Sequence, residues 1–157
     1  MNHKLRREII DILDTGRDLT LATLRADGAP QATTVSYVND GLAIYFGCGA
    51  HSQKAENLAR DDRVSLTVDL PYANWNEIRA LSLFGRARRL TALTDIDAVG
   101  RLFLARFSEL NAFAAAPGEM ALFAVTPLVI SILDYRKGFG HSELVTAAEL
   151  EAVPNED

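Results

Sequence analysis

One short segment of the sequence, "HSQKAEN" at residues 51–57, contains residue types that suit the binding of an anion. Ser52 is placed to cap a helix, so Lys54 falls in the first helical turn. A lysine there opposes the helix dipole at a cost of up to about 1 kcal/mol. A phosphate at the helix N-terminus would remove that cost, because backbone N–H groups, the Ser52 hydroxyl and the Lys54 ammonium would converge on it. The alternative is a capped helix whose Lys54 points to solvent.

A second group of candidate residues is a set of arginines at the end of a strand-like run. Arg86 and Arg88 are two residues apart and share one face of a strand, whereas Arg89 points to the other face. These charges either keep a strand edge in solvent or provide a supplementary phosphate or substrate contact through Arg86 and Arg88. The residue types alone leave both interpretations open.

The histidines and the cysteine do not form a metal-binding pattern. His51 and His141 are far apart, and no carboxylate or cysteine lies at ligand spacing, so we expect no metal site. Cys48 is the only cysteine, which excludes an intrachain disulfide. We interpret Cys48 as a small packed residue because no base lies near it in the sequence.

The composition restricts the class of protein. The chain has 157 residues, of which 48% are hydrophobic and 24% charged, and this suits a single domain over residues 1–157. A net charge of −5 argues against a nucleic-acid binder held by phosphate contacts. No signal peptide and no apolar run long enough to span a membrane is recognisable, so we expect a cytoplasmic protein with no membrane partner.

Periodic patterns indicate the elements that must position these residues. Helical spacing predicts a first helix over residues 2–15, and later helices over residues 51–60 and 94–110. Asp-Gly pairs at residues 27–28 and 40–41 are strong hairpin signals between strand-like runs. The expected strands cover residues 18–25, 31–38, 42–47, 63–70 and 77–90, with Gly85 as a bulge or bend, and two segments within residues 120–135 that are separated at Pro127.

Six or seven antiparallel strands joined by short turns, without alternating helices, favour a barrel. We therefore expect a mainly β protein with peripheral helices, in which an antiparallel split barrel of about six strands occupies residues 18–135. Residues 136–157 would form a C-terminal tail, whose last residues, 147–157, are polar enough to fray.

The order of these elements resembles the pyridoxamine 5'-phosphate oxidase-like FMN-binding split barrels, over about residues 18–135. The segment from "SQKAENL" to "DDRVSLTV" is the most specific part of the resemblance. It implies that Ser52 and Lys54 bind the FMN phosphate, with Gln53 in place of the arginine of the oxidases. It also implies a homodimer with FMN at the interface. The residues expected near the flavin ring are Thr33, Thr34, Val35 and Ser36.

The resemblance further implies an FMN-dependent oxidoreductase that acts on a small molecule the sequence does not identify. The absence of a recognisable acid–base motif fits this class, because the flavin carries the redox chemistry. Two alternatives on the same fold stay open: a haem-binding or haem-utilisation protein with His141 as iron ligand, and a non-enzymatic module for flavin or a deazaflavin coenzyme. Trp75, the single tryptophan, belongs to the core or the dimer interface, or stacks beside the flavin.

Overall fold

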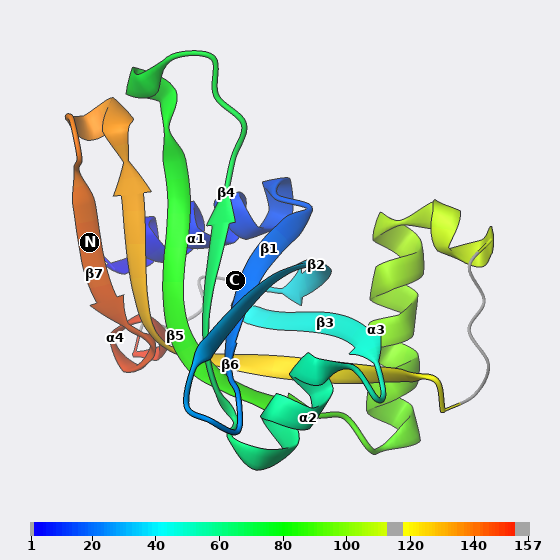
Figure 1. Cartoon of the computed structure of the whole chain (residues 1–157). Helices are drawn as coiled ribbons and strands as arrows, with labels where there is room; N and C mark the ends of the chain where they lie inside the picture. Colours follow the sequence, from blue (N-terminus) through cyan, green and yellow to red (C-terminus); the bar gives the residue numbers. More distant parts are fainter. Residues whose placement is uncertain (1, 113–117, 153–157) are drawn as a thin grey trace.

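Antiparallel strands close into a six-stranded barrel in the computed structural model, which describes residues 2–112 and 118–152 (Figure 1). The sheet order is β3-β2-β1-β4-β5-β6-β7, and a further pairing of β3 with β6 closes the barrel. The strands are β1 (Asp18–Leu24), β2 (Pro30–Asp40), β3 (Ala43–Gly49), β4 (Arg63–Asp69), β5 (Arg79–Arg89), β6 (Met120–Asp134) and β7 (Ser142–Thr146). The predicted mainly β barrel of about six strands is confirmed.

Helices lie around the barrel. They are α1 (Asn2–Thr15), α2 (Gln53–Arg60), α3 (Leu93–Arg106) and α4 (Ala147–Glu151), with short 3₁₀ turns η1 (Trp75–Glu77), η2 (Ser108–Ala112) and η3 (Tyr135–Lys137). Figure 1 shows α3 standing beside the strands and α2 at one end of the barrel. None of the helices within the described residues is long and apolar enough to cross a membrane.

The core follows from the alternation of each strand. In β4, Val64, Leu66 and Val68 are buried while the residues between them are exposed, as a half-buried strand requires. Phe46 of β3 and Phe123 of β6 stack inside the barrel with ring centroids 5.2 Å apart. Because each large apolar side chain contributes about 1.5–3 kcal/mol on burial, these inward rows supply the main stabilisation.

Strand β6 is one continuous strand, so the prediction of two segments separated at Pro127 is wrong. The register between β5 and β6 shifts at Gly85, which pairs with Pro127, while Phe84 pairs with Val129. Leu128 is therefore the extra residue of a bulge. Pro127 has no N–H to donate, and the irregular pairing at this position lets the strand continue past it. The expected bulge at Gly85 is confirmed.

We expect Gly85→Ala to lower the free energy of unfolding by about 1–3 kcal/mol, the usual cost of overpacking. A Cβ at Gly85 would clash with the Thr126 carbonyl oxygen and lie 3.3 Å from Pro127 Cα, and backbone atoms cannot move aside as a side chain can. Urea unfolding monitored by circular dichroism measures the change. Gly100→Ala is the matched control, because nothing lies within 4 Å of a Cβ built there. Equal stability of the two variants would contradict the packing argument.

The C-terminal segment is more ordered than the prediction of a fraying tail. Strand β7 pairs with β6, and α4 begins at a capping box in which the Thr146 hydroxyl accepts from Glu149 N–H and the Glu149 carboxylate accepts from Thr146 N–H. Leu150 is fully buried in the main core, and Asn2 Nδ2 donates to the Glu149 carbonyl. The tail therefore closes over α1. Residues 153–157 of the predicted tail lie outside the described residues.

Candidate functional site

The first turn of α2 carries the residues that the sequence selects for phosphate binding. Ser52 is the N-cap, and its Oγ accepts from Ala55 N–H at 3.3 Å. Glu56 N–H makes the first helical bond, to the Ser52 carbonyl, so the N–H groups of Gln53 and Lys54 precede the intrahelical ladder. Lys54 is half-buried, and its ammonium makes no hydrogen bond or ion pair with any residue the structure describes. Donors and one positive charge therefore gather at this helix end.

Asn57 anchors this helix to the barrel, and sequence reasoning missed it. Its side chain is fully buried, and Nδ2 donates to Thr23 Oγ1 at 3.0 Å and to Gln31 Oε1 at 3.1 Å. Gln53 Nε2 in turn donates to Asn57 Oδ1 at 2.9 Å. The available signal was a polar residue close in sequence to the apolar residues Ala55 and Leu58 of a short helix. Gln53 is thus turned toward this network.

Strand β2 has one open edge beside α2. Residues 30–36 pair with β1, but β2 pairs with β3 only over residues 37–40, and β3 continues to Gly49 paired with β6 alone. No described strand occupies the second edge of residues 30–36. The barrel is split at this position, and the open edge starts at Gln31, where α2 is anchored.

The expected flavin-contacting residues alternate across β2. Thr34 and Ser36 are exposed on the outer wall, whereas Val35 is buried and Thr33 half-buried, facing the barrel interior. Ser36 Oγ donates to Asp18 Oδ1 at 2.8 Å. Only two of the four predicted side chains therefore face outward, and Thr33 and Val35 can take part only through their backbone.

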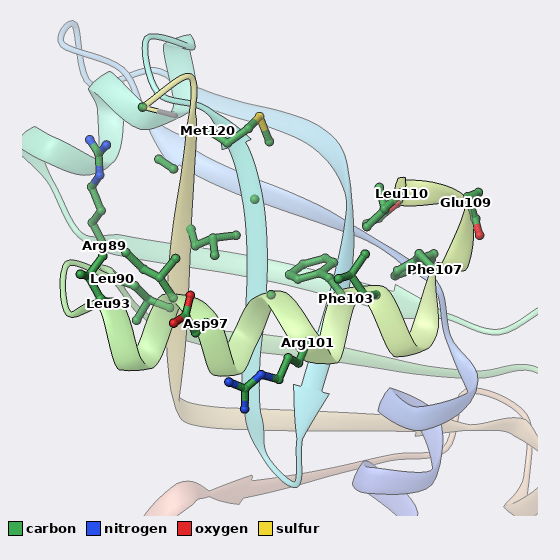
Figure 2. A pocket seen from close by; sticks show the side chains of 18 residues that line it. Arg89, Leu90, Leu93, Asp97, Arg101, Phe103, Phe107, Glu109, Leu110 and Met120 are labelled. Atoms are coloured by element: carbon green, nitrogen blue, oxygen red, sulfur yellow. The ribbon is translucent and has the colours of Figure 1, made fainter. Parts of the chain in front are cut away.

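A large pocket adjoins the outward face of β2 at Ser36. It has a volume of about 1300 Å³ and lies between α3 and the outer wall of β3 and β6 (Figure 2). Ser36 of β2 and Gly47 of β3 line it, so the pocket adjoins the split of the barrel. Arg89 also lines the pocket, whereas Arg86 and Arg88 do not. Arg89, which lies on the opposite strand face from Arg86 and Arg88, is thus the one of these three arginines that lines the pocket.

Arg86 has a partner of its own. Its Nη1 donates to Asp62 Oδ1 at 2.5 Å, and the neighbouring Arg63 forms a two-bond pair with Asp61 at 3.0 and 2.7 Å. The hydrogen bonds from Arg63 lower the pKa of Asp61 to about 2. The charges of Arg63 and Arg86 are therefore compensated, which supports the solvated-edge interpretation of Arg86.

The β4–β5 connection lies at the barrel end opposite α2, and its turn η1 contacts η3 (Figure 1). Trp75 is the first residue of η1. It is 65% exposed, so its interpretation as a core residue is wrong. Its ring stacks on Phe139 with centroids 6.3 Å apart, and Tyr135 contacts the other side of the cluster at 5.3 Å from Phe139. The structure thus places an exposed aromatic cluster far from the α2 site within one subunit.

His141 belongs to a charged network at that same end. Its Nε2 lies 3.7 Å from Glu143 Oε2, and Lys137 Nζ donates to Glu143 at 3.1 Å and to Glu8 at 3.0 Å. The hydrogen bond from Lys137 holds the pKa of Glu143 below its usual value. Within the described parts of the chain, no three histidine, cysteine or carboxylate side chains gather as metal ligands.

The sequence matches the family model described as pyridoxamine 5'-phosphate oxidase over residues 5–134. A comparison with curated protein sequences found no match. Among solved structures, a heme binding protein from Mycobacterium smegmatis aligns with a TM-score of 0.80 and 21% identity, over 94% of this chain and 60% of that one. The hypothetical protein Rv2991 from Mycobacterium tuberculosis aligns with a TM-score of 0.74 and 28% identity, over 90% and 92% of the two chains.

A candidate pyridoxamine 5'-phosphate oxidase from Listeria innocua aligns with a TM-score of 0.69 and 21% identity, over 83% of this chain and 98% of that one. Structural likeness at such identities establishes a shared fold. The family model, in contrast, spans most of the sequence, including α2 and the split of the barrel. The chain therefore belongs to the pyridoxamine 5'-phosphate oxidase-like family.

Proposed function

We propose that this protein binds FMN as a homodimer and acts as an FMN-dependent oxidoreductase on a small molecule. The observation that carries the proposal is the Lys54 ammonium, which has no partner among the described residues, at the N-terminus of a helix that Asn57 joins to Gln31 of β2. A helix N-terminus and a lysine suit a phosphate, and an open strand edge offers backbone groups to a ring with polar edges. The family membership supports the choice of cofactor.

The residues present fit this cofactor. Gln31 contacts α2 through Asn57, and Ser36 lies five residues further along β2, which corresponds to about 16 Å of strand. Gly47 and Gly49 occupy alternate positions of β3 beside the split and present no side chains there. We call the surface from the N-terminus of α2 along residues 31–36 of β2 the cofactor track. An elongated molecule with a phosphate at one end and a flat ring at the other suits it.

Each residue then has a defined role. Ser52, Lys54 and the first N–H groups of α2 would hold the phosphate. Gln53 would support the helix through Asn57 instead of contacting the phosphate, because its amide donates inward. Thr34 and Ser36 would face the ring from the outer wall. Bound FMN would supply the electron transfer that the side chains themselves cannot perform.

The outer wall of the barrel supports the proposal of a homodimer. Apart from Phe84, which lies opposite Ser65, its central outward positions on four neighbouring strands are small and uncharged: Thr20, Ala22, Ala32, Thr34, Ser65, Thr67, Ala80 and Ser82. These positions are exposed or half-buried, and interface centres are depleted of charge in the same way. A second copy of the chain would enclose a cofactor that a single barrel leaves on its surface. The expected contacts of Trp75, Arg86 and Arg88 with the cofactor are part of this homodimer proposal, since the second copy would bring them to it.

We expect Lys54→Ala to weaken FMN binding by about 1–3 kcal/mol, or about five- to 150-fold, because a charge-assisted hydrogen bond is lost. Titration of the apoprotein with FMN, followed by quenching of flavin fluorescence, gives the affinity. Lys4→Ala is the control, since Lys4 is an exposed lysine of α1 whose side chain is 71% accessible. Unchanged affinity in Lys54→Ala would remove Lys54 from the phosphate site, and greater stability without loss of FMN would favour the solvent-exposed lysine.

Haem is the second candidate ligand, because a heme binding protein is among the structural relatives. His141 would have to turn its Nε2 away from Glu143 to reach an iron atom, since in this conformation the atom is enclosed. The visible spectrum of the purified protein distinguishes the cofactors: flavin bands support FMN or a related flavin, with a blue-shifted spectrum for a deazaflavin coenzyme. A Soret band that disappears in His141→Ala would replace the FMN proposal.

A further inference from the structure

The pocket beside α3 has mostly apolar walls. Phe103 and Phe107 stack along one side with centroids 6.2 Å apart, and Met120 and Leu122 of β6 face them (Figure 2). Met120 is 50% exposed and Leu104 46% exposed, although both are large apolar side chains. Apolar surface left open to water at this scale is typical of a binding site.

Four charged side chains also line the pocket. Two arginines and two carboxylates line it, and Glu109 is already paired with Arg17 at 3.4 Å. Figure 2 shows Arg101 directed away from Phe103, on the other side of α3. The Ser36 hydroxyl donates its proton to Asp18, so it does not serve an anion either. The pocket therefore offers a charged ligand few groups of opposite charge with which to pair.

Gly100 in the middle of α3 keeps the pocket open. It lines the cavity, and a Cβ built on it would meet no atom within 4 Å. Glycine in a helix interior costs about 1 kcal/mol relative to alanine, and close packing does not require it here. An alanine at this position would therefore stabilise the helix without meeting any described atom, so the glycine serves only to leave the space in front of it free.

The pocket also continues into the proposed cofactor track. Ser36 and Gly47 line the pocket and flank the split between β2 and β3. A molecule held against Phe103 and Met120 would therefore lie next to the position proposed for the flavin ring. This continuity favours a substrate site over a cavity without function.

We propose that this pocket binds the substrate of the enzyme and that the substrate is an uncharged, largely apolar ring compound. This inference rests on the proposed function, because the cofactor track defines which end of the pocket is reactive. A phosphorylated vitamin fits the pocket less well, since Arg89 is opposed by Asp97 among the lining residues. Gly100 is then a specificity-determining residue, because the size of the side chain at this position sets the free volume.

The experiment compares two probes of the same shape, naphthalene-2-carboxamide and naphthalene-2-carboxylate, on the purified FMN-loaded protein. Isothermal titration should give at least tenfold tighter binding of the neutral amide than of the acid. Gly100→Leu should weaken binding of the amide at least tenfold by filling the cavity, whereas Gly100→Ala should change it less than threefold. FMN affinity and the thermal midpoint should not fall in either variant, since both substitutions raise helix propensity.

Three results would overturn the inference. Tighter binding of the carboxylate would make the pocket an anion site centred on Arg89. Equal binding of the amide to wild type and Gly100→Leu would place the ligand elsewhere. A change from dimer to monomer in Gly100→Leu, measured by light scattering, would show that a second copy fills the pocket. If wild type binds the amide but not FMN, the proposed function fails while the pocket assignment stands, because the two affinities are measured separately.

Discussion

Replacing Arg106 with alanine is expected to lower the free energy of unfolding by about 2–4 kcal/mol, the largest stability effect we predict for a single side chain. Arg106 ends α3, and its Nη2 donates to the carbonyls of Leu13, Asp14 and Gly16 at the C-terminus of α1. Its Nη1 donates to Asn39 Oδ1 at 3.1 Å. The substitution leaves these helix-end carbonyls without their charged donor.

The guanidinium of Arg106 also joins α3 to the core. It lies over the ring of Tyr37 at 5.0 Å from the centroid, and the Tyr37 hydroxyl donates to the Leu13 carbonyl at 2.7 Å. Burial raises the pKa of Tyr37 to about 12, so this hydroxyl keeps its proton and remains a donor through the physiological range. One arginine thus connects α3, α1 and β2, and α3 forms a wall of the pocket.

Urea unfolding of Arg106→Ala against wild type, at constant m-value, measures the effect. Arg106→Lys should recover part of the loss, since an ammonium can serve one or two of the carbonyls but not the planar set. Arg101→Ala, on the exposed face of α3, is the control and should change stability by less than about 0.5 kcal/mol. A loss below 1 kcal/mol in Arg106→Ala would show that solvent replaces these bonds at little cost.

The second large effect is expected at Asn57. Asn57→Ala should lower the free energy of unfolding by about 2–3 kcal/mol, because buried Thr23 loses a partner and the amides of Gln31 and Gln53 lose theirs. FMN affinity should fall at least fivefold as well, although Asn57 is fully buried and does not face the cofactor track. The physical reason is that the N-terminus of α2 is positioned through this side chain.

Two measurements separate positioning from general instability. Gln53→Ala removes one bond of the network and should cost about 0.5–1 kcal/mol, with a correspondingly smaller loss of FMN affinity. Gly85→Ala is a destabilised variant outside the Asn57 hydrogen-bond network, and its folded fraction should bind FMN like wild type. If Asn57→Ala binds FMN normally at a temperature where it is fully folded, the role of Asn57 in positioning α2 is refuted.

Local sequence signals predicted the barrel because its turns are short and chemically marked. The Asp-Gly pairs lie in the β1–β2 and β2–β3 turns, where Gly28 and Gly41 adopt positive φ values of 83° and 57°. Ser52 caps α2 as its residue type predicts. These are contacts between neighbours in sequence, so composition and spacing are enough to predict them.

The prediction at Pro127 was wrong because the outcome depended on a distant strand. A proline inside a strand normally interrupts the pairing, and the sequence around it gives no other information. In the fold, Gly85 of β5 lies opposite and absorbs the irregularity. The third helix is a smaller case, since the pattern predicted one helix over residues 94–110, whereas α3 ends at Arg106 and η2 follows it.

By itself, the sequence determined the fold class, the hairpins, the bulge at Gly85 and the segment with Ser52 and Lys54 at a helix start. Only the tertiary structure decided how that helix is held, which faces of β2 are outward, and that α3 and β6 enclose a pocket beside the split. Asn57 meets Gln31 across 26 residues, and Arg106 meets Leu13 across 93. Such contacts depend on the closure of the whole barrel, which no local pattern encodes.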